Sequence, residues 1–236
     1  MRHLRTLIIF DKGGIGSTAG WQAVHESLTR SIQSIDFPTG SGTLTLRKKT
    51  RRSDNQWDRN GVGYLKTQFL NHMVEKEGWK KEVGFNIGKK QTPPLLRLYP
   101  GLTPTREPIT SDFGDFDFVT TAADDLHVAI EWETGNVSSS HRSMNKLAIV
   151  LASGQLGAGV LVVPSRNLYE HLTDRIGNIG ELSGYLSMWK NLRSPVRYGL
   201  LAVAVVEHNN LTDDASFPYL HSGVDGRARQ GRAKRK

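Results

Sequence analysis

The sequence contains no cysteine, which excludes disulfide bonds and thiolate metal sites and fits a reducing compartment. It also lacks any apolar run near the roughly 18 residues that a membrane-spanning helix needs. The longest such run, residues 200–206, has the length of a buried strand, and the apolar stretch within residues 1–10 is too short for a signal peptide. We therefore expect a cytoplasmic protein with no membrane partner.

Acidic charge is in short supply, because 31 Lys and Arg residues face 23 Asp and Glu residues, a formal net charge of +8. Positive charge gathers in two blocks: residues 47–52, "RKKTRR", and the end of the chain. The second block holds Arg227, Arg229, Arg232, Lys234, Arg235 and Lys236. Solvated loops explain either block alone, but two blocks together favour a polyanionic partner, with nucleic acid as the default. We expect a single domain over residues 1–221 and a basic, disordered tail over residues 222–236.

Hydrophobic periodicity predicts an α/β protein. Strands are predicted at residues 4–10, 43–47, 82–88, 116–120, 126–133, 159–165 and 198–208. Helices are predicted at residues 18–35, 62–79, 138–153 and 176–190. Continuous apolar strands that alternate with helices are typical of a central β-sheet covered by helices on both faces.

A glycine-rich segment, "DKGGIGST" at residues 11–18, lies between a predicted strand and a predicted helix. A phosphate-binding loop needs a lysine directly before its Ser or Thr, to reach the terminal phosphates. Here Gly16 precedes Ser17, so we interpret the segment as a turn and expect no nucleotide cofactor.

Two carboxylates end the most strand-like run of the sequence. Glu131 and Glu133 are expected to point the same way, about 7 Å apart along the strand, with Trp132 on the opposite face. On the preceding strand Asp117 lies between two phenylalanines, which we expect to share the other face. If the strands pair, the three acids meet, and carboxylate oxygens without cysteine suit Mg²⁺. The competing interpretation is an edge strand with solvated acids.

The segment after the acids is polar and rich in hydrogen-bond donors. One of the serines at residues 138–140 is expected to cap a helix, whose N-terminus favours phosphate, and Arg142 follows in its first turns. His127 and His141 are expected to be surface residues rather than metal ligands, because no second histidine is spaced to join either one.

The pattern of Asp117 followed by Glu131-x-Glu133 resembles the restriction-endonuclease-like nuclease superfamily, whose motif is an Asp on one strand and Asp/Glu-x-Lys on the next. With glutamate in place of this lysine, the pattern resembles that of type II restriction endonucleases of the BamHI/BglII group. Asn136 and Ser138 lie three and five positions after the second acid, as in that group.

The resemblance extends over residues 116–190, where Asp174 and Arg175 match a base-reading Asp-Arg pair. It leaves the first hundred residues unmatched. Asp115 remains a rival to Asp117, and Glu107 is the nearest candidate for the group's additional upstream acid.

The resemblance implies a central mixed β-sheet and a homodimer that cuts palindromic double-stranded DNA with Mg²⁺, two ions to each active site. It implies that Asp117, Glu131 and the main-chain carbonyl of Trp132 are metal ligands. It also implies that Glu133 orients or deprotonates the attacking water. DNA-binding residues would be Asn136, Ser138, Arg142, Asp174 and Arg175. The implied target is GGATCC, or more broadly a GATC-centred site. A non-specific repair or recombination nuclease of the same superfamily is the alternative, and a glycosidase would leave the basic blocks without a role.

Overall fold

The computed structural model describes residues 1–85, 92–109, 114–173 and 176–221. A six-stranded sheet forms its centre, in the order β1-β11-β10-β9-β8-β5. These strands are β1 (Arg2–Lys12), β11 (Gly199–Glu207), β10 (Ala158–Pro164), β9 (His127–Trp132), β8 (Phe116–Thr121) and β5 (Lys80–Val83). Strands β11, β10 and β9 run parallel to one another. The pairs β1/β11, β9/β8 and β8/β5 are antiparallel. The prediction of a mixed central sheet is therefore confirmed.

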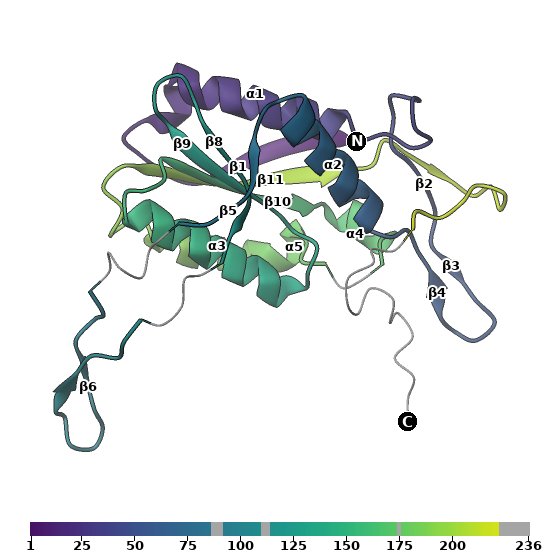
Figure 1. Ribbon diagram of the computed structural model, residues 1–236. Coiled ribbons are helices and arrows are strands. Elements are labelled where there is room, and N and C mark those ends of the chain that lie inside the picture. Colours follow the sequence, from purple (N-terminus) through teal and green to yellow (C-terminus); the bar gives the residue numbers. More distant parts are fainter. Residues whose placement is uncertain (86–91, 110–113, 174–175, 222–236) are drawn as a thin grey trace.

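Helices cover both faces of the sheet, as the sequence predicts (Figure 1). The helices are α1 (Ala19–Gln33), α2 (Gly63–Glu75), α3 (Val137–Ala152), α4 (Arg166–Glu170), α5 (Ile179–Leu182) and α6 (Leu186–Asn191). One apolar core lies between the sheet and α1 and α2, and a second lies between the sheet and α3, α5 and α6. Every residue of β10 and β11 is buried, because each of these strands is covered from both sides.

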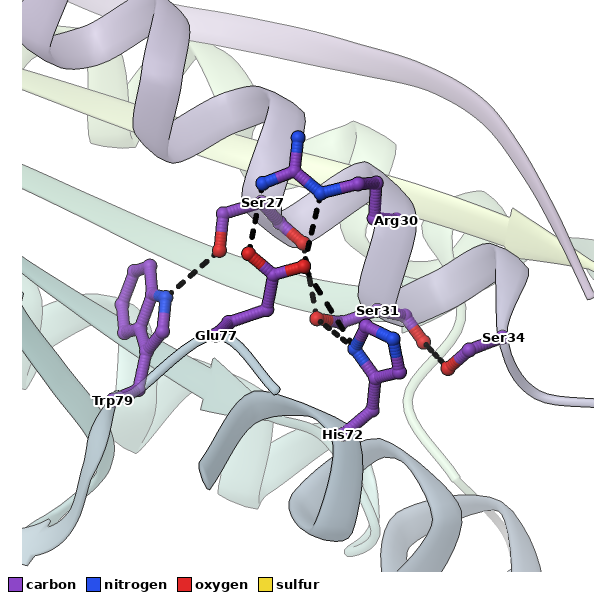
Figure 2. A network of polar contacts seen from close by, with 7 residues as sticks. All are labelled: Ser27, Arg30, Ser31, Ser34, His72, Glu77 and Trp79. Atoms are coloured by element: carbon purple, nitrogen blue, oxygen red, sulfur yellow. Dashed lines mark hydrogen bonds and ion pairs between the residues drawn. The ribbon is translucent and has the colours of Figure 1, made fainter. Parts of the chain in front are cut away.

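A polar network joins α1 to the segment after α2 (Figure 2). The guanidinium group of Arg30 donates two hydrogen bonds to Glu77, at 2.9 and 2.8 Å. The Trp79 indole donates to Ser27 at 2.9 Å, and the His72 ring lies 3.0 Å from the Ser31 hydroxyl. These contacts lock α2 against α1, and α2 packs Phe69 onto the aromatic side chain of Trp132.

Three small pairs of strands extend the central body (Figure 1). They are β2 (Thr45–Arg47) with β12 (Asn210–Thr212), β3 (Thr50–Arg51) with β4 (Trp57–Asp58), and β6 (Leu96–Arg97) with β7 (Pro104–Thr105). Apart from the strand predicted at residues 43–47, which matches β2, these short strands follow no periodicity that the sequence displays. Within the described residues, no helix is long and apolar enough to span a membrane.

Two predicted helices differ from the structure. The helix predicted over residues 176–190 is broken into α5, a single 3-10 turn, Ser183–Tyr185, and α6. The helix predicted to reach residue 79 ends at Glu75, and the chain turns at Gly78, whose φ of 72° favours glycine. In both places an apolar pattern continues through a turn, so periodicity alone cannot locate the break.

The glycine-rich segment at residues 11–18 is a turn. The carboxylate of Asp11 accepts hydrogen bonds from the backbone N–H groups of Ile15 and Gly16, both at 2.9 Å. An anion would need these same donors. The Thr18 side chain then caps α1 by accepting from the Trp21 N–H at 3.2 Å. The side chain of Asp11 therefore fills the place of a phosphate.

Candidate active site

Glu131 and Glu133 lie where β9 ends, beside the N-terminus of α3. Glu131 shares the α3 side of the sheet with Ala129, while Trp132 lies on the other side, in the core beneath α1 and α2. The ring of Trp132 packs against Phe69 with the ring centroids 4.4 Å apart. The alternation predicted from the sequence is confirmed for this strand.

Asp117 joins the two glutamates from the neighbouring strand β8. Its Oδ2 accepts a hydrogen bond from the backbone N–H of Trp132 at 2.8 Å, and its Oδ1 accepts from Lys66 Nζ at 3.0 Å. The carboxylate is close enough to contribute to raising the pKa of both Glu131 and Glu133. The structure thus brings together the three acids that the sequence singles out.

The prediction that Phe116 and Phe118 share one face is wrong. Phe118 packs under α2, with its ring centroid 5.2 Å from that of Phe69, whereas Phe116 belongs to the core beneath α3. Regular alternation is lost at the start of β8. There the pairing of β5 with β8 skips Glu82 and Asp117, and Glu82 has a left-handed φ of 52°.

Glu131 forms a buried ion pair with Lys146 of α3. Lys146 Nζ also donates to the backbone carbonyl of Asp115 at 2.7 Å and lies 4.3 Å from the centroid of the Phe116 ring. Burial raises the pKa of Glu131 to about 7, although the Lys146 ammonium group lowers it. The sequence analysis did not identify this lysine. It could have been found because Lys146 falls on the apolar, buried face of the amphipathic helix α3, where a charged residue is unusual.

Glu133 is held by the turn that follows it. Its Oε1 accepts from the Gly135 N–H at 2.6 Å. Its Oε2 is buried and has no partner of hydrogen-bond geometry within the described residues, although the Ser140 hydroxyl is close enough to lower its pKa. Burial has the larger effect and raises the pKa of Glu133. A carboxyl group whose pKa is raised in this way is a better proton acceptor than an ordinary glutamate.

The other candidate acids lie outside this group. Asp115 is exposed, and its side chain lies so close to Gly84 that a Cβ there would meet Asp115 Oδ1 at 2.6 Å. Glu107 is exposed beyond β7, and Glu82 is exposed on β5. Among the residues that the structure describes, Asp117 is the carboxylate whose charge contributes to the raised pKa values of both glutamates. The geometry therefore favours Asp117 over Asp115.

The segment that starts α3 presents the predicted DNA-binding side chains. Asn136, Ser138 and Arg142 are all exposed. The expected serine cap is wrong, because Asn136 caps α3: its Oδ1 accepts from the N–H groups of Ser138 and Ser139, at 3.0 and 3.3 Å. Asparagine outcompetes serine here because it precedes the first helical residue, Val137.

The predicted Asp174 and Arg175 lie outside the described residues, but the residues that follow them are fixed beside the start of α3. Ile176 bridges to Asn136, and the Gly177 N–H donates to the Gly135 carbonyl at 3.0 Å. The sequence neighbours of the predicted base-reading pair therefore lie next to the helix that carries the other predicted readers.

Neither single histidine joins the acids. His127 is exposed and hydrogen-bonds the Thr121 hydroxyl at 2.9 Å, whereas His141 is half-buried against Tyr185, with ring centroids 4.2 Å apart.

The basic segment at residues 47–52 is partly neutralised by ion pairs with acidic residues elsewhere in the chain. Lys48 lies 2.6 Å from Asp213, and Lys49 lies 3.2 Å from Glu170.

The three acids provide only oxygen donors, which is the set that a hard divalent cation prefers. The buried, unpartnered Oε2 of Glu133 fits such an ion. Within the described ranges no three His, Asp or Glu side chains are gathered tightly enough to enclose a metal ion. Instead Lys66 and Lys146 supply the positive charge, each to one carboxylate.

Comparison with known proteins gives consistent results. The model of the restriction endonuclease BamHI family matches residues 1–227. The type II restriction enzyme OkrAI of Oceanobacter kriegii is 30% identical over 213 residues, which cover 90% of this chain and 93% of that enzyme. The type II restriction enzyme BamHI of Bacillus amyloliquefaciens is 44% identical over 61 residues, covering 26% of this chain and 29% of that enzyme.

Among solved structures, a crystal structure of restriction endonuclease BglII complexed with a DNA 16-mer has the same fold, with a TM-score of 0.57 and 9% identity. The match covers 94% of this chain and 90% of that one. Sheet order, helical layers and a matching family model over nearly the whole length point the same way. The chain therefore belongs to the BamHI family of type II restriction endonucleases.

Proposed function

We propose that this protein is a Mg²⁺-dependent homodimeric endonuclease that cuts palindromic double-stranded DNA, with GGATCC as its site or, more broadly, a six-base site centred on GATC. The observation that carries the proposal is the position of Asp117, Glu131 and Glu133. They lie at the end of two paired strands, directly before a capped helix that exposes Asn136, Ser138 and Arg142. The DNA in the BglII structure supports a duplex partner.

The cutting chemistry is assigned to the strand ends. Asp117 and Glu131 would hold a divalent ion together with the main-chain carbonyl of Trp132, and the oxygen donors suit two such ions. A bound ion of this kind supplies charge neutralisation at the phosphate and lowers the pKa of a nearby water. Glu133, with its raised pKa, would orient that water and accept its proton.

Base reading is assigned to the start of α3 and to Asp174 and Arg175. An arginine pairs naturally with O6 and N7 of guanine, and an aspartate accepts from the amino group of cytosine. Two copies related by a two-fold axis would read a palindrome, which is the reason for proposing a dimer.

Digestion of a plasmid of known sequence tests the proposal. With Mg²⁺ we expect discrete fragments whose mapped ends share a GATC core. Discrete ends without that core would overturn the site and leave the nuclease standing. A smear of fragments would indicate the non-specific nuclease of the same superfamily, and the absence of cutting with either Mg²⁺ or Mn²⁺ would contradict both.

A further inference from the structure

Two lysines reach the acids from opposite sides of the sheet. Lys146 comes from α3 and pairs with Glu131, while Lys66 comes from α2 and pairs with Asp117. Each lysine therefore pairs with one carboxylate, and the charge of Lys66 also lowers the pKa of Glu131. The two lysines differ in how firmly they are held, and this difference separates their roles.

Lys146 is fixed in place. Its side chain is only 10% exposed, and its ammonium group contacts Glu131, the Asp115 carbonyl and the face of Phe116. Moving it would leave the Asp115 carbonyl without this donor and the buried Glu131 carboxylate without its cation, which is costly. Lys146 is therefore a structural cation.

Lys66 is held by much less. Its side chain is 34% exposed, and its one hydrogen bond to the described part of the chain is the 3.0 Å contact to Asp117 Oδ1. Breaking that contact exposes the ammonium group to water and leaves no buried group unpaired. The rest of Asp117 stays in place, because its Oδ2 is held by the Trp132 N–H. Asp117 can thus change its partner on Oδ1 without moving.

A divalent ion at Asp117 would compete with this ammonium group. The two cations would need the same carboxylate oxygen, and at contact distance they repel each other strongly. The residue that can yield is Lys66, since Lys146 and the Trp132 N–H are fixed by the fold.

We propose that Lys66 is an exchangeable counter-cation, which occupies Asp117 Oδ1 in the free protein and leaves it when a divalent ion binds. This inference rests on the proposed function, because it takes Asp117 to be a metal ligand. The displaced ammonium group, on a flexible and partly exposed side chain, is then free to pair with a DNA phosphate. Metal binding and DNA binding would reinforce each other through this one side chain, and such coupling is reciprocal.

The test is Mn²⁺ binding to the full-length protein without DNA, measured by titration with electron paramagnetic resonance. Lys66→Met keeps the aliphatic chain and removes the charge, so we expect it to bind Mn²⁺ about tenfold more tightly than the wild type, as expected for the loss of one nearby, partly exposed charge. Lys76→Met is the matched control. Lys76 is exposed at the C-terminal end of α2, about 15 Å further along the helix axis, and its loss should change nothing.

Two further variants link the effect to Asp117. Lys66→Arg keeps the charge and should bind Mn²⁺ like the wild type. In an Asp117→Asn background the Lys66→Met change should have a much smaller effect, because the contested oxygen has lost its charge and only the weaker influence of Lys66 on Glu131 remains. Lys66→Gln serves as a second neutral variant, in case Lys66→Met does not fold.

Several results would overturn the inference. If the wild type binds Mn²⁺ and both neutral variants bind it equally or more weakly, the exchange is wrong while the proposed function stands. If neither the wild type nor the neutral variants bind Mn²⁺, both the exchange and the metal-dependent function fail. Mn²⁺ binding by the neutral variants alone would support the exchange in its strongest form.

Discussion

A carboxylate that is buried, paired with a lysine and still close to two other acids is a candidate for chemistry. Glu131 meets this description, and Asp117 adjoins it. We predict that Glu131→Gln and Asp117→Asn each lower plasmid cleavage about a thousandfold or more while DNA binding persists, because each removes charge but keeps shape. Asp115→Asn is the control and should cut normally. Loss of cleavage in that control alone would make Asp115 the ligand.

Glu133 tests whether two ions are used. Glu133→Lys introduces the residue that is common in the wider superfamily, and here we predict inactivity with both Mg²⁺ and Mn²⁺. A lysine would repel a second ion and would leave the Gly135 N–H without its acceptor. Glu133→Gln keeps that acceptor, so it separates the loss of charge from the loss of the turn. Measurable cutting by Glu133→Lys in a plasmid assay would contradict a two-ion site.

At this scale the sequence identifies the acids but not their counter-cations. Alternation along a strand predicts that Glu131 and Glu133 share a side, because that depends only on neighbouring residues. Lys66 and Lys146 are 51 residues before Asp117 and 15 residues after Glu131, respectively, on two different helices. Which lysine meets which acid depends on how both helices pack, and periodicity carries no such information.

The start of α3 and the segment at residues 176–178 form one structural unit. We predict that Gly177→Ala lowers cutting at the specific site while non-specific DNA affinity barely changes. The added Cβ would meet Ser140 Oγ at 2.1 Å and the Val137 Cα at 3.2 Å, which would push the two segments apart. Gly184→Ala is the control, because a Cβ there meets nothing within 4 Å.

The measurement for this pair is competition binding with specific and random duplexes. An unchanged ratio of the two affinities in Gly177→Ala would show that the packing of these segments does not control base reading.

The contact between α1 and the end of α2 gives a prediction for pH. The Arg30 guanidinium group lowers the pKa of Glu77 below its ordinary value of 4.5, so its contribution to stability is present above that pH and is lost as the pH falls through the lowered pKa. We predict that Glu77→Gln melts at a lower temperature than the wild type at neutral pH, and that the difference narrows below pH 4.5.

Thermal unfolding followed by circular dichroism checks this pH dependence. Glu75→Gln makes the same change at an exposed neighbouring position and should melt like the wild type throughout. A constant difference between Glu77→Gln and the wild type at every pH would mean that the carboxylate stabilises the contact through packing rather than charge.

Prediction of the elements succeeds where a strand or helix is buried along its length. The strand at residues 199–207 and the helix at residues 137–152 are found almost at their true ends. It fails for the short strands β3, β4, β6 and β7, which are mostly exposed and are held by turns rather than by an apolar face. It also fails at residues 183–185, where apolar residues continue across a break.

For the molecule as a whole, positive charge is the quantity to test. We predict that removing residues from Gly226 onward weakens binding to all DNA sequences alike and flattens its salt dependence. The deletion removes six cations that follow no pattern suited to reading bases. Binding measured at several salt concentrations checks this, on specific and random duplexes. A changed recognition site after truncation would give these residues a role in base reading.

The covered sheet and the meeting of the three acids follow from simple sequence properties, whereas the order of the strands does not. Fully apolar strands separated by helices predict a sheet covered on both faces, which the structure confirms. The sequence alone does not predict the order β1-β11-β10-β9-β8-β5. Strand β1 lies near the N-terminus and pairs with β11, which is close to the other end of the sequence. The acids lie together because β8 and β9 pair, as expected of two strands that follow each other directly in the sequence.

Glu131, Glu133, Asn136, Ser138, Arg142 and Lys146 all fall within a single short stretch of sequence. A transplant of that one stretch between relatives would carry two of the carboxylates proposed to cut DNA, the helix start proposed to face the bases, and Lys146, which pairs with Glu131. A crossover inside it would instead pair the glutamate of one parent with the lysine of the other. For anyone assembling chimeras from such enzymes, cleavage and this part of recognition are linked traits, and the practical boundaries lie in the loops before β9 and after α3.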